Sequence, residues 1–431
     1  MSMSPLATSI RQAYQDSVAQ LNGASTLPFH VSRAEALERF LDVGVPTVRH
    51  EEWKYTNVMP LAAASWSHNA SSWSNTAPAT AGVVLDGLQD AIRIEVRNGV
   101  ITRNAEDTLP DGVTVAALST GNIQDANVEQ FHAHPFAAAT IALAGEGILI
   151  DVADGAVCTK TIHISVFCDA EEGDHLTTTR VLVRAGRHAK VDIVESHHTL
   201  GNARVLDLAV CSVLVGEGGH VTYVKILDDT DRLHHLGHIV ASVDRTGTFA
   251  SHSMNINAGF VRNDAQVRLI GEQSQGFLFG VSVLDGAQYV DNHTVVDHVV
   301  PHCHSEELYK GVYNGSSTGV FNGKIFVRPQ AQKTTAYQSS HSLLLSGKAQ
   351  VNAKPQLEIW ADDVKCSHGA TTGQLNEDAV FYLQARGLER SKAVAMLTNA
   401  FAAEVIEKLP HAGLQQHLLL RLADKLGASG L

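Results

Sequence analysis

The sequence predicts a mainly β fold with helical regions at both ends. Apolar and β-branched residues alternate through residues 134–360, which is typical of strands. Glycines recur in that stretch about every 30 residues, and long helical patterns are confined to the two ends. A strand unit repeated without intervening helices predicts a stacked β-solenoid. A large antiparallel sandwich, in which the same glycines close hairpins, is the alternative.

The glycine spacing is the main argument for the solenoid. Successive steps of 32, 29 and 29 residues separate Gly186, Gly218, Gly247 and Gly276, and 28 residues separate Gly319 from Gly347. We expect each of these glycines in a turn between strands. The period alone favours the solenoid over the sandwich by a small margin.

Two helices are predicted near the N-terminus. In residues 9–23 the apolar side chains follow helical spacing, and Gly23 suits a left-handed C-cap. In residues 31–44, Ser32 and Glu35 have the spacing of a capping box, and a glycine ends the pattern.

Residues 60–125 are rich in Ala, Ser, Asn and Gly, which predicts loops and a few strands. The chain therefore divides into three expected regions. These are a helical and irregular region at 1–130, a β core at 131–365 and a helical domain at 366–431.

Three helices are predicted in the last region. Residues 373–388 form one with Asn376 as its N-cap, residues 391–410 form the next with Ser391 as its N-cap, and residues 412–427 form the third. Within the second helix, we expect Glu404 and Lys408 to form an i,i+4 pair. The leucine stripe of the third, at Leu414, Leu418, Leu419 and Leu422, is expected in the core of the protein.

Composition excludes several classes of protein. A net charge of -13 and a pI near 5.9 do not suit nucleic acid or anionic membranes. Apolar runs stop well short of the roughly 20 residues that span a bilayer. The N-terminal stretch MSMSPLATSIRQAYQDS lacks a secretion signal, and the five cysteines form no CxxC pair. We expect free thiols and a cytoplasmic protein.

Motifs of common enzymes are absent from the sequence. GKIF at 323–326 and GKAQ at 347–350 lack the Ser or Thr that follows the lysine of a P-loop. GxSxG and HExxH are also missing. We assign no catalytic residue and predict that the protein is not an enzyme.

Cys366 and His368, in the stretch DDVKCSHGATTG, are the candidate metal ligands. Residues two apart on a strand point to one face, so a thiol and an imidazole would lie together. A closed zinc or iron–sulfur site usually needs four ligands. This stretch therefore offers half a site, which remote residues or another polypeptide would complete. The alternative is a buried cysteine and a hydrogen-bonded histidine with purely structural roles.

A second group of possible ligands comprises His293, His298, His302, Cys303, His304 and Glu306. Neighbouring residues alternate between the faces of a strand, so three adjacent ligands could not reach one ion without irregular backbone. With 23 histidines in the chain, chance clusters are expected. We interpret this group as polar surface or loop residues.

Several longer strings resemble a known family. EEWKYTNV at 51–58, the stretch 308–346 beginning LYKGVYNG, and the stretch 354–388 containing KCSHGATTGQL resemble SufD-type members of the SufB/SufD family. That family belongs to the SUF machinery for iron–sulfur cluster assembly. The chain lacks the N-terminal cysteine cluster of SufB-type members, and carries CSHGATTGQL where they tend toward a Glu-His-Glu arrangement.

The resemblance implies a right-handed parallel β-helix between the two helical regions. It implies pairing with SufB through the β-helices and binding of the ATPase SufC through the C-terminal helices, at about residues 376–425. Iron or a nascent cluster, held transiently and shared with SufB, would meet the family's Cys-x-His positions, which are Cys366 and His368 here. A reduced flavin could take part in the complex. Without SufB, a second copy of the chain could pair in its place.

The resulting hypothesis is a scaffold subunit that contributes to cluster assembly or iron acquisition at the SufB/SufD interface. The alternative is a purely structural β-helix partner with no metal ligands of its own. An enzyme that uses the histidine-rich surface or the solenoid for other chemistry has little support, because no paired carboxylates stand at a clear spacing.

Overall fold

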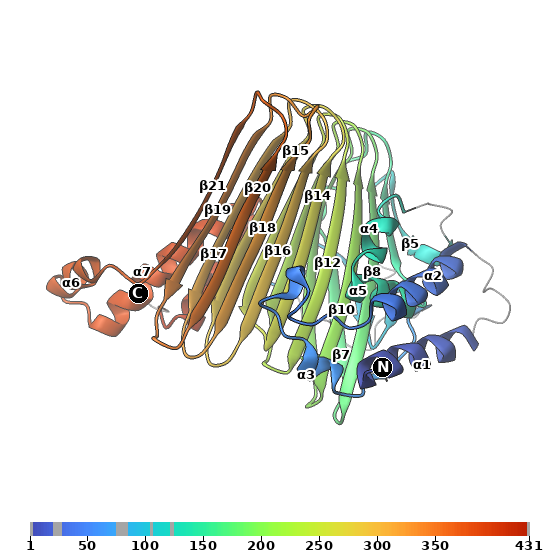
Figure 1. Ribbon diagram of the computed structural model, residues 1–431, viewed down its shortest axis with the longest axis horizontal. Helices are drawn as coiled ribbons and strands as arrows, with labels where there is room; N and C mark the ends of the chain where they lie inside the picture. The colour runs from blue at the N-terminus through green and yellow to red at the C-terminus, as the bar shows by residue number, and fades with distance from the viewer. Residues whose placement is uncertain (1–2, 20–27, 75–84, 104–106, 121–124, 429–431) are drawn as a thin grey trace.

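The fold is a parallel β-solenoid with helices at both ends (Figure 1). It is seen in a computed structural model that describes residues 3–19, 28–74, 85–103, 107–120 and 125–428. Two sheets face each other, and from β6 onward successive strands alternate between them. Parallel pairing excludes the antiparallel sandwich and confirms the β-helix between helical regions.

Ten of the described strands form the first sheet, called sheet A. Its members are β1 (Ser67–His68), β5 (Val113–Ala117), β6 (Ile148–Val152), β8 (Asp174–Ala185), β10 (Arg204–Val215), β12 (Leu233–Val243), β14 (Phe260–Leu269), β16 (Tyr289–His298), β18 (Thr318–Val327) and β20 (Gln350–Ile359).

Eleven of the described strands form the opposite sheet, called sheet B. Its members are β2 (Ser72–Ser74), β3 (Ile92–Arg97), β4 (Val100–Arg103), β7 (Ile162–Asp169), β9 (Lys190–Leu200), β11 (His220–Asp228), β13 (Thr248–Asn257), β15 (Gln275–Leu284), β17 (His304–Tyr313), β19 (Thr335–Leu344) and β21 (Lys365–Gly373). The last strand thus continues the solenoid beyond residue 365, the expected end of the β core.

Residues that are one solenoid turn apart in the sequence lie side by side on neighbouring strands of the same sheet. Val210 on β10 lies opposite Arg180 on one side and His238 on the other. Four of the six expected turn glycines lie between strands, whereas Gly276 and Gly319 lie within β15 and β18. The prediction was wrong for these two. At Gly319 the reason is packing, because a Cβ there would collide with the buried ring of Tyr313.

Many strands are apolar on both faces because both faces are buried. On β10, Cys211 and Val213 point into the solenoid, while Leu206 and Leu208 point outward against helices. A parallel strand covered on both sides reads as a continuous apolar run. This explains why residues 205–215 are apolar except for Asp207 and Ser212.

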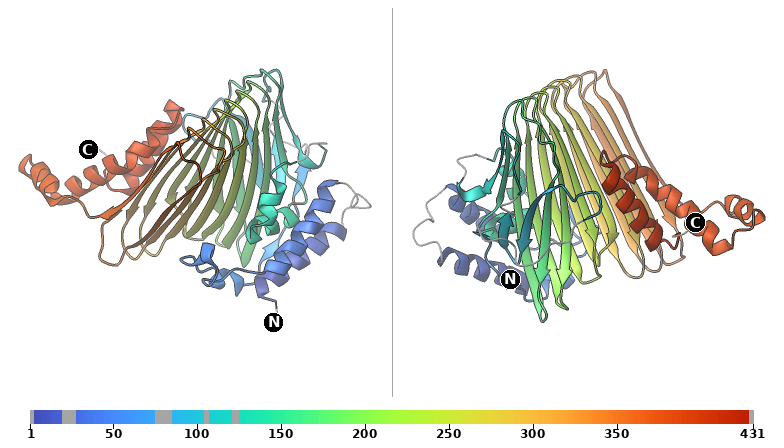
Figure 2. Two further views of the ribbon diagram at one scale, coloured as in Figure 1. Left: turned by 45° about the horizontal axis from the view of Figure 1, so that its top comes forward. Right: turned by 180° about the vertical axis from the view of Figure 1, so that it is seen from behind.

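The N-terminal helices cover the outer face of sheet A (Figures 1 and 2). Every residue of α5 is buried, and the helix packs on β8, β10 and β12 with α1 and α2 outside it. The bounds are α1 (Pro5–Ala19), α2 (Pro28–Val43), α3 (Met59–Ala62), α4 (Val128–His132) and α5 (Pro135–Leu143), with 3₁₀ turns η2 (Glu51–Trp53) and η3 (Leu118–Thr120).

One predicted cap in this region is wrong. Helix α2 begins at Pro28, so Ser32 lies inside it and its hydroxyl donates to the carbonyl of Phe29 instead of capping. Gly44, with φ +71°, follows the helix as predicted. The expected cap at Gly23 lies outside the described residues.

The C-terminal helices are α6 (Glu377–Ala385), α7 (Arg390–Ile406) and α8 (Ala412–Lys425). α7 and α8 pack on the outer face of sheet B, as the reverse view in Figure 2 shows. Leu414, Leu418 and Leu422 are buried there, which confirms the predicted core stripe. Within the described residues, no helix is long and apolar enough to cross a membrane.

The predicted helix ends are partly correct. The Asn376 side chain accepts from the backbone N–H groups of Asp378 and Ala379, which confirms the cap of α6. Ser391 lies inside α7, whose N-cap is Glu389. The sequence placed that cap too late because Ser is a common cap residue, whereas Glu389 has no side-chain cap bond.

The expected ion pair within α7 is replaced by two pairs to β17. Glu404 pairs with Lys310, and Lys408 lies 2.9 Å from Glu306. Helical spacing alone could not reveal these partners, because they come from a strand 94 and 102 residues earlier in the chain. The two pairs fasten the helix to sheet B.

Candidate functional site

Cys366 and His368 lie on β21, at the open end of the solenoid. Among the described strands, β21 pairs with β19 alone, so its other edge is free. Cys366 is half-buried and packs against the solenoid core, while His368 is exposed. Both belong to the inward face of β21, as the two-residue spacing predicts.

His368 stands at the end of a column of polar side chains inside the solenoid. It pairs in register with Gln338 on β19, which pairs in turn with Glu307 on β17. The Gln338 amide Nε2 donates to Glu307 Oε1 over 3.0 Å, and Thr294 donates to Glu307 Oε2 over 2.5 Å. The amide oxygen of Gln338 is buried and has no hydrogen-bond partner among the described residues.

Burial controls the protonation of the groups near this end. Burial raises the pKa of Glu307 to about 7, against the smaller opposing effect of its two hydrogen bonds. Burial also raises the pKa of the Cys366 thiol, so that the thiol is protonated at neutral pH in the isolated chain. A metal ion at this position would compete with that proton.

The donor set suits iron better than a hard cation. A thiolate and an imidazole are soft and borderline ligands, which iron and iron–sulfur clusters accept. Two protein ligands from one chain leave the remaining coordination positions to other groups. Because the strand edge beside them is free, a second polypeptide could approach closely enough to supply those groups.

The second predicted group of ligands is not brought together. His293 faces outward from β16, whereas His298 is fully buried inside the solenoid with Nε2 2.9 Å from the Ser305 hydroxyl. Cys303 is buried among core residues. The interpretation of these histidines as polar surface or loop residues is wrong for His298, which is fully buried within β16.

The other cysteines of the chain, Cys158, Cys168 and Cys211, are also free and buried. In Cys168, burial raises the pKa of the thiol to about 12. Such thiols are poor ligands and poor nucleophiles at neutral pH.

A buried network of charged residues inside the solenoid was not predicted from the sequence. His197 lies between Glu195 and Asp207, 2.6 Å and 2.7 Å from their carboxylate oxygens, and His235 is 2.6 Å from Asp207. Burial alone would lower the pKa of His197, but the two carboxylates raise it to about 9. The protonated ring and Lys225, whose Nζ lies 3.6 Å from Glu195, together balance the two carboxylates, so a metal ion is not needed there.

The fold and the site together define a class of protein. This is a β-helix protein that carries a thiol and an imidazole on the edge strand at one end. Residues 167–401 match the family described as "SUF system FeS cluster assembly, SufBD core domain", and residues 6–164 match "SufBD protein N-terminal region". The core-domain match covers more than half of the chain.

The chain belongs to the SufBD family of iron–sulfur cluster assembly proteins and is SufD-like. It is 29% identical to "Iron-sulfur cluster assembly protein SufD" of Escherichia coli (strain K12), over 90% of this chain and 91% of the relative. It is 27% identical to the SufBD family protein slr0076 of Synechocystis sp., over 87% and 86%. It is 26% identical to "Protein ABCI7, chloroplastic" of Arabidopsis thaliana, over 94% and 88%.

Proposed function

We propose that this protein is a scaffold subunit that holds iron or a nascent cluster at an interface with a SufB-type partner. The observation that carries the proposal is the placement of Cys366 and His368 on an edge strand. Iron or the cluster is the cargo of this site and passes on to other proteins. Because each chain supplies only some of the ligands, the shared site binds its cargo weakly enough to release it.

The free edges of β20 and β21 support pairing with another β-helix. The unused backbone N–H and C=O groups of an edge strand can extend a sheet across an interface. A SufB-type chain bound there would cover Cys366 and His368 and would bring its own ligands to them. In the proposal, this chain supplies ligands and performs no catalytic step.

We propose that the C-terminal helices bind a SufC-type ATPase, with α6 as the main contact. Helix α6 projects away from the solenoid (Figure 1), and the side chains of Phe381 and Tyr382 on it are 71% and 58% exposed. Large apolar side chains exposed next to each other mark protein interfaces. α7 and α8 serve mainly to fasten this region to sheet B.

The docking proposal is tested with the double variant Phe381→Ala/Tyr382→Ala. It should lose most binding to SufC in a pull-down while its melting temperature is unchanged, because neither side chain is buried. Leu420→Ala, which removes an exposed leucine from α8, is the matched control and should bind as the wild type does. Normal binding by the double variant would refute docking through α6.

The chain's role is tested by omission from a reconstituted reaction. SufB and SufC are incubated anaerobically with iron, a sulfide source and ATP, with and without this chain, and cluster formation is followed by visible absorption. We expect markedly faster or more complete cluster formation with the chain present. Equal formation without it would contradict the scaffold role. Adding a reduced flavin in a parallel series shows whether the complex uses one.

The alternative is a structural partner without ligands of its own. In that case the complex would need the β-helix but not the thiol or the imidazole. The free thiols, which suit a reducing compartment, support a cytoplasmic site of action.

A further inference from the structure

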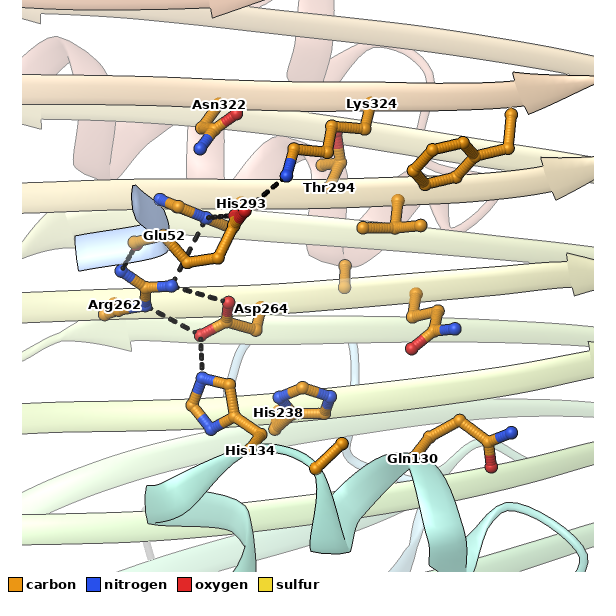
Figure 3. Close-up of a pocket in the computed structure, with 15 residues that line it drawn as sticks. Glu52, Gln130, His134, His238, Arg262, Asp264, His293, Thr294, Asn322 and Lys324 are labelled. Carbon is orange, nitrogen blue, oxygen red and sulfur yellow. Dashed lines mark hydrogen bonds and ion pairs between the residues drawn. The ribbon is translucent and has the colours of Figure 1, made fainter. Parts of the chain in front are cut away.

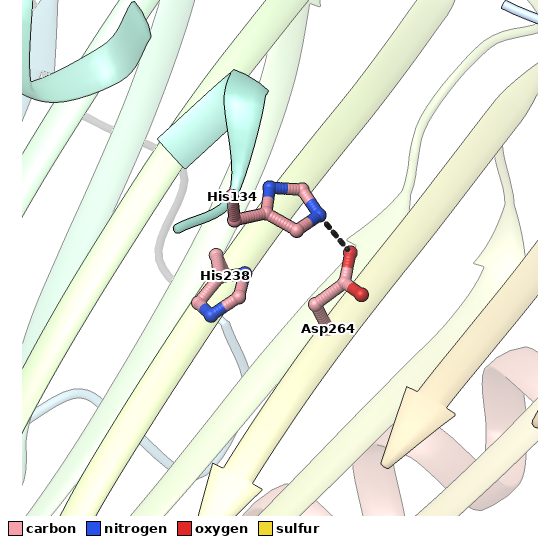
Figure 4. Close-up of side chains that lie close together, drawn as sticks. All are labelled: His134, His238 and Asp264. Atoms are coloured by element: carbon pink, nitrogen blue, oxygen red, sulfur yellow. Dashed lines mark ion pairs between the residues drawn. The ribbon is translucent and has the colours of Figure 1, made fainter. Parts of the chain in front are cut away.

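A cavity of about 240 Å³ lies on the outer face of sheet A, far along the chain from Cys366 (Figure 3). Its walls come from α4 and the two residues between α4 and α5, from the 3₁₀ turn η2 and from β12, β14, β16 and β18. Three potential metal ligands meet at one end of it: His134, His238 and Asp264 (Figure 4). Their ligand atoms all lie within 4.8 Å of one another.

The three ligands come from three separate elements. His134 precedes α5 and faces Asp264 of β14, with Nε2 3.3 Å from a carboxylate oxygen. His238 stands on the neighbouring strand β12, and its ring centroid is 4.7 Å from that of His134. Because the sheet is rigid and Asp264 is in register with His238, the carboxylate and this imidazole keep a fixed separation.

The buried and unpaired side chain of His238 is the observation that indicates a bound metal ion. Its side chain is nine-tenths buried, and neither ring nitrogen has a hydrogen-bond partner among the described residues. Leaving a buried polar group unpaired costs about 1–3 kcal/mol, so such a group needs an explanation.

The charge around the cavity leaves room for a cation. Arg262 is fully buried, and it shares its charge between Asp264, at 2.9 Å, and Asp291, at 3.0 Å. Lys324 pairs with Glu52 at the cavity wall. Three carboxylates thus face two side chains that are always cationic, and the imidazoles of His134 and His293 lie 3.3 Å from Asp264 and 3.1 Å from Asp291. Arg262 holds Asp264 in place as outer-shell partners of ligating carboxylates do.

The His134 ring can present Nε2 to a metal ion. Its Nδ1 lies 3.4 Å from the backbone N–H of Ala137, which is a long hydrogen bond and cheap to lose. Metal binding at Nε2 would place the ring proton on Nδ1, at the cost of this contact with Ala137 alone.

We propose that His134, His238 and Asp264 bind a divalent first-row transition metal, with its open coordination positions facing the cavity. Two imidazoles and one carboxylate suit Zn²⁺, Fe²⁺ or Co²⁺ rather than Mg²⁺ or Ca²⁺. The cavity is large enough for water or a small ligand to complete the coordination. This site is independent of the scaffold function proposed for Cys366 and His368.

The buried network around His197 is a useful contrast. It also holds two histidines and a carboxylate close together, but there the histidines already pair with carboxylates at 2.6–2.7 Å. At the cavity, His238 has no such partner. Of these two groups, only the cavity group contains a histidine with neither ring nitrogen paired.

The test uses Co²⁺ as the probe in the full-length chain with Cys366→Ser and His368→Ala, which removes the other candidate site. We expect one Co²⁺ per chain, with visible absorption of nitrogen and oxygen ligation and no thiolate charge-transfer band. Adding His238→Gln should weaken the affinity at least about tenfold. His252→Gln replaces a histidine of β13 that is more deeply buried than His238 and lies outside the cavity, and should leave the affinity unchanged.

Two results would overturn the proposal. One is the absence of Co²⁺ binding in the Cys366→Ser/His368→Ala background, and the other is equal affinity after His238→Gln. If His238→Gln does not fold, X-ray absorption of Co²⁺ bound to the background protein decides. A spectrum that shows imidazole and oxygen ligands and no sulfur ligand supports the proposed site. A spectrum without imidazole ligands refutes it. Neither outcome bears on whether Cys366 and His368 bind iron.

Discussion

At the scale of single residues, Glu307 is the group whose protonation matters most near the candidate site. It is fully buried beneath Gln338 and His368, and its pKa of about 7 lies well above the ordinary value of 4.5. Between these two values the folded protein holds a proton that the unfolded chain has lost. Stability therefore falls as the pH rises through this window and stays reduced above it.

Glu307→Gln should abolish this dependence. The amide cannot ionise, but its oxygen can still accept a hydrogen bond from Thr294 or Gln338. We expect the free energy of unfolding at pH 8 to rise by up to about 3 kcal/mol, and the loss of stability between pH 4.5 and 7 to shrink. Urea unfolding at a series of pH values measures both.

Glu306→Gln is the matched control, because Glu306 is the preceding residue and its carboxylate reaches the surface beside Lys408. It should keep the wild-type dependence on pH. A wild-type slope in Glu307→Gln would show that this carboxyl is already ionised in the folded protein.

Residue spacing could predict only part of the site. Cys366 and His368 were found because their two-residue spacing is visible within one strand. Glu307 and Gln338 were missed because they meet His368 only through the register of three strands. Their spacings of 31 and 30 residues match the repeat, so the repeat itself was the signal that could have found them. His134 and His238 could not be paired, since no repeat relates a helix cap to a strand.

At the scale of elements, burial of the leucine stripe holds α8 on sheet B. Leu414 is fully buried, whereas Leu420 on the same helix is 62% exposed. Leu414→Ala should lower the free energy of unfolding by about 2–5 kcal/mol, because it leaves a cavity in the interface. Leu420→Ala should change it by less than about 0.5 kcal/mol. Hydrogen exchange should locate the loosening from Leu414→Ala in α7 and α8, and equal effects of the two variants would contradict the packing described.

The strands and helices were largely predictable, whereas their ends were not. Two-residue alternation located the strands, and helical spacing located the α1, α2 and α6 to α8 regions. Expected caps at Ser32 and Ser391 failed because short sequence motifs also occur inside helices. Glu404 and Lys408 failed as a pair because partners from β17 were closer.

At the scale of the whole molecule, the free edges at β20 and β21 predict self-association. Exposed edge strands pair with other chains when nothing covers them. The isolated protein should therefore form dimers, seen by sedimentation velocity as the concentration rises. Thr372→Lys adds a charge to β21 and should shift the equilibrium toward monomer. A protein that is monomeric at every concentration would contradict edge pairing.

The overall fold was predictable because most of it consists of one repeated strand unit, whereas the candidate site at β21 was predictable only in part. The period favoured a solenoid, and the family resemblance supplied the parallel β-helix that the structure confirms. The order of strands in the two sheets then follows from alternation along the chain. What the repeat could not supply was the placement of the helices, which depends on the apolar outer faces of sheets A and B.

The most direct test of the proposed function is the iron content of the complex. The chain is co-purified anaerobically with SufB and SufC, as the wild type and as His368→Ala, and iron and sulfide are measured. His341→Ala is the control, because His341 lies nearby on β19 but on the outward face, where Nδ1 is 2.7 Å from the Thr371 hydroxyl. We expect His368→Ala to lose most of the iron while the complex stays intact and the control keeps it. Unchanged iron in an intact His368→Ala complex would make this chain a structural partner without metal ligands at β21.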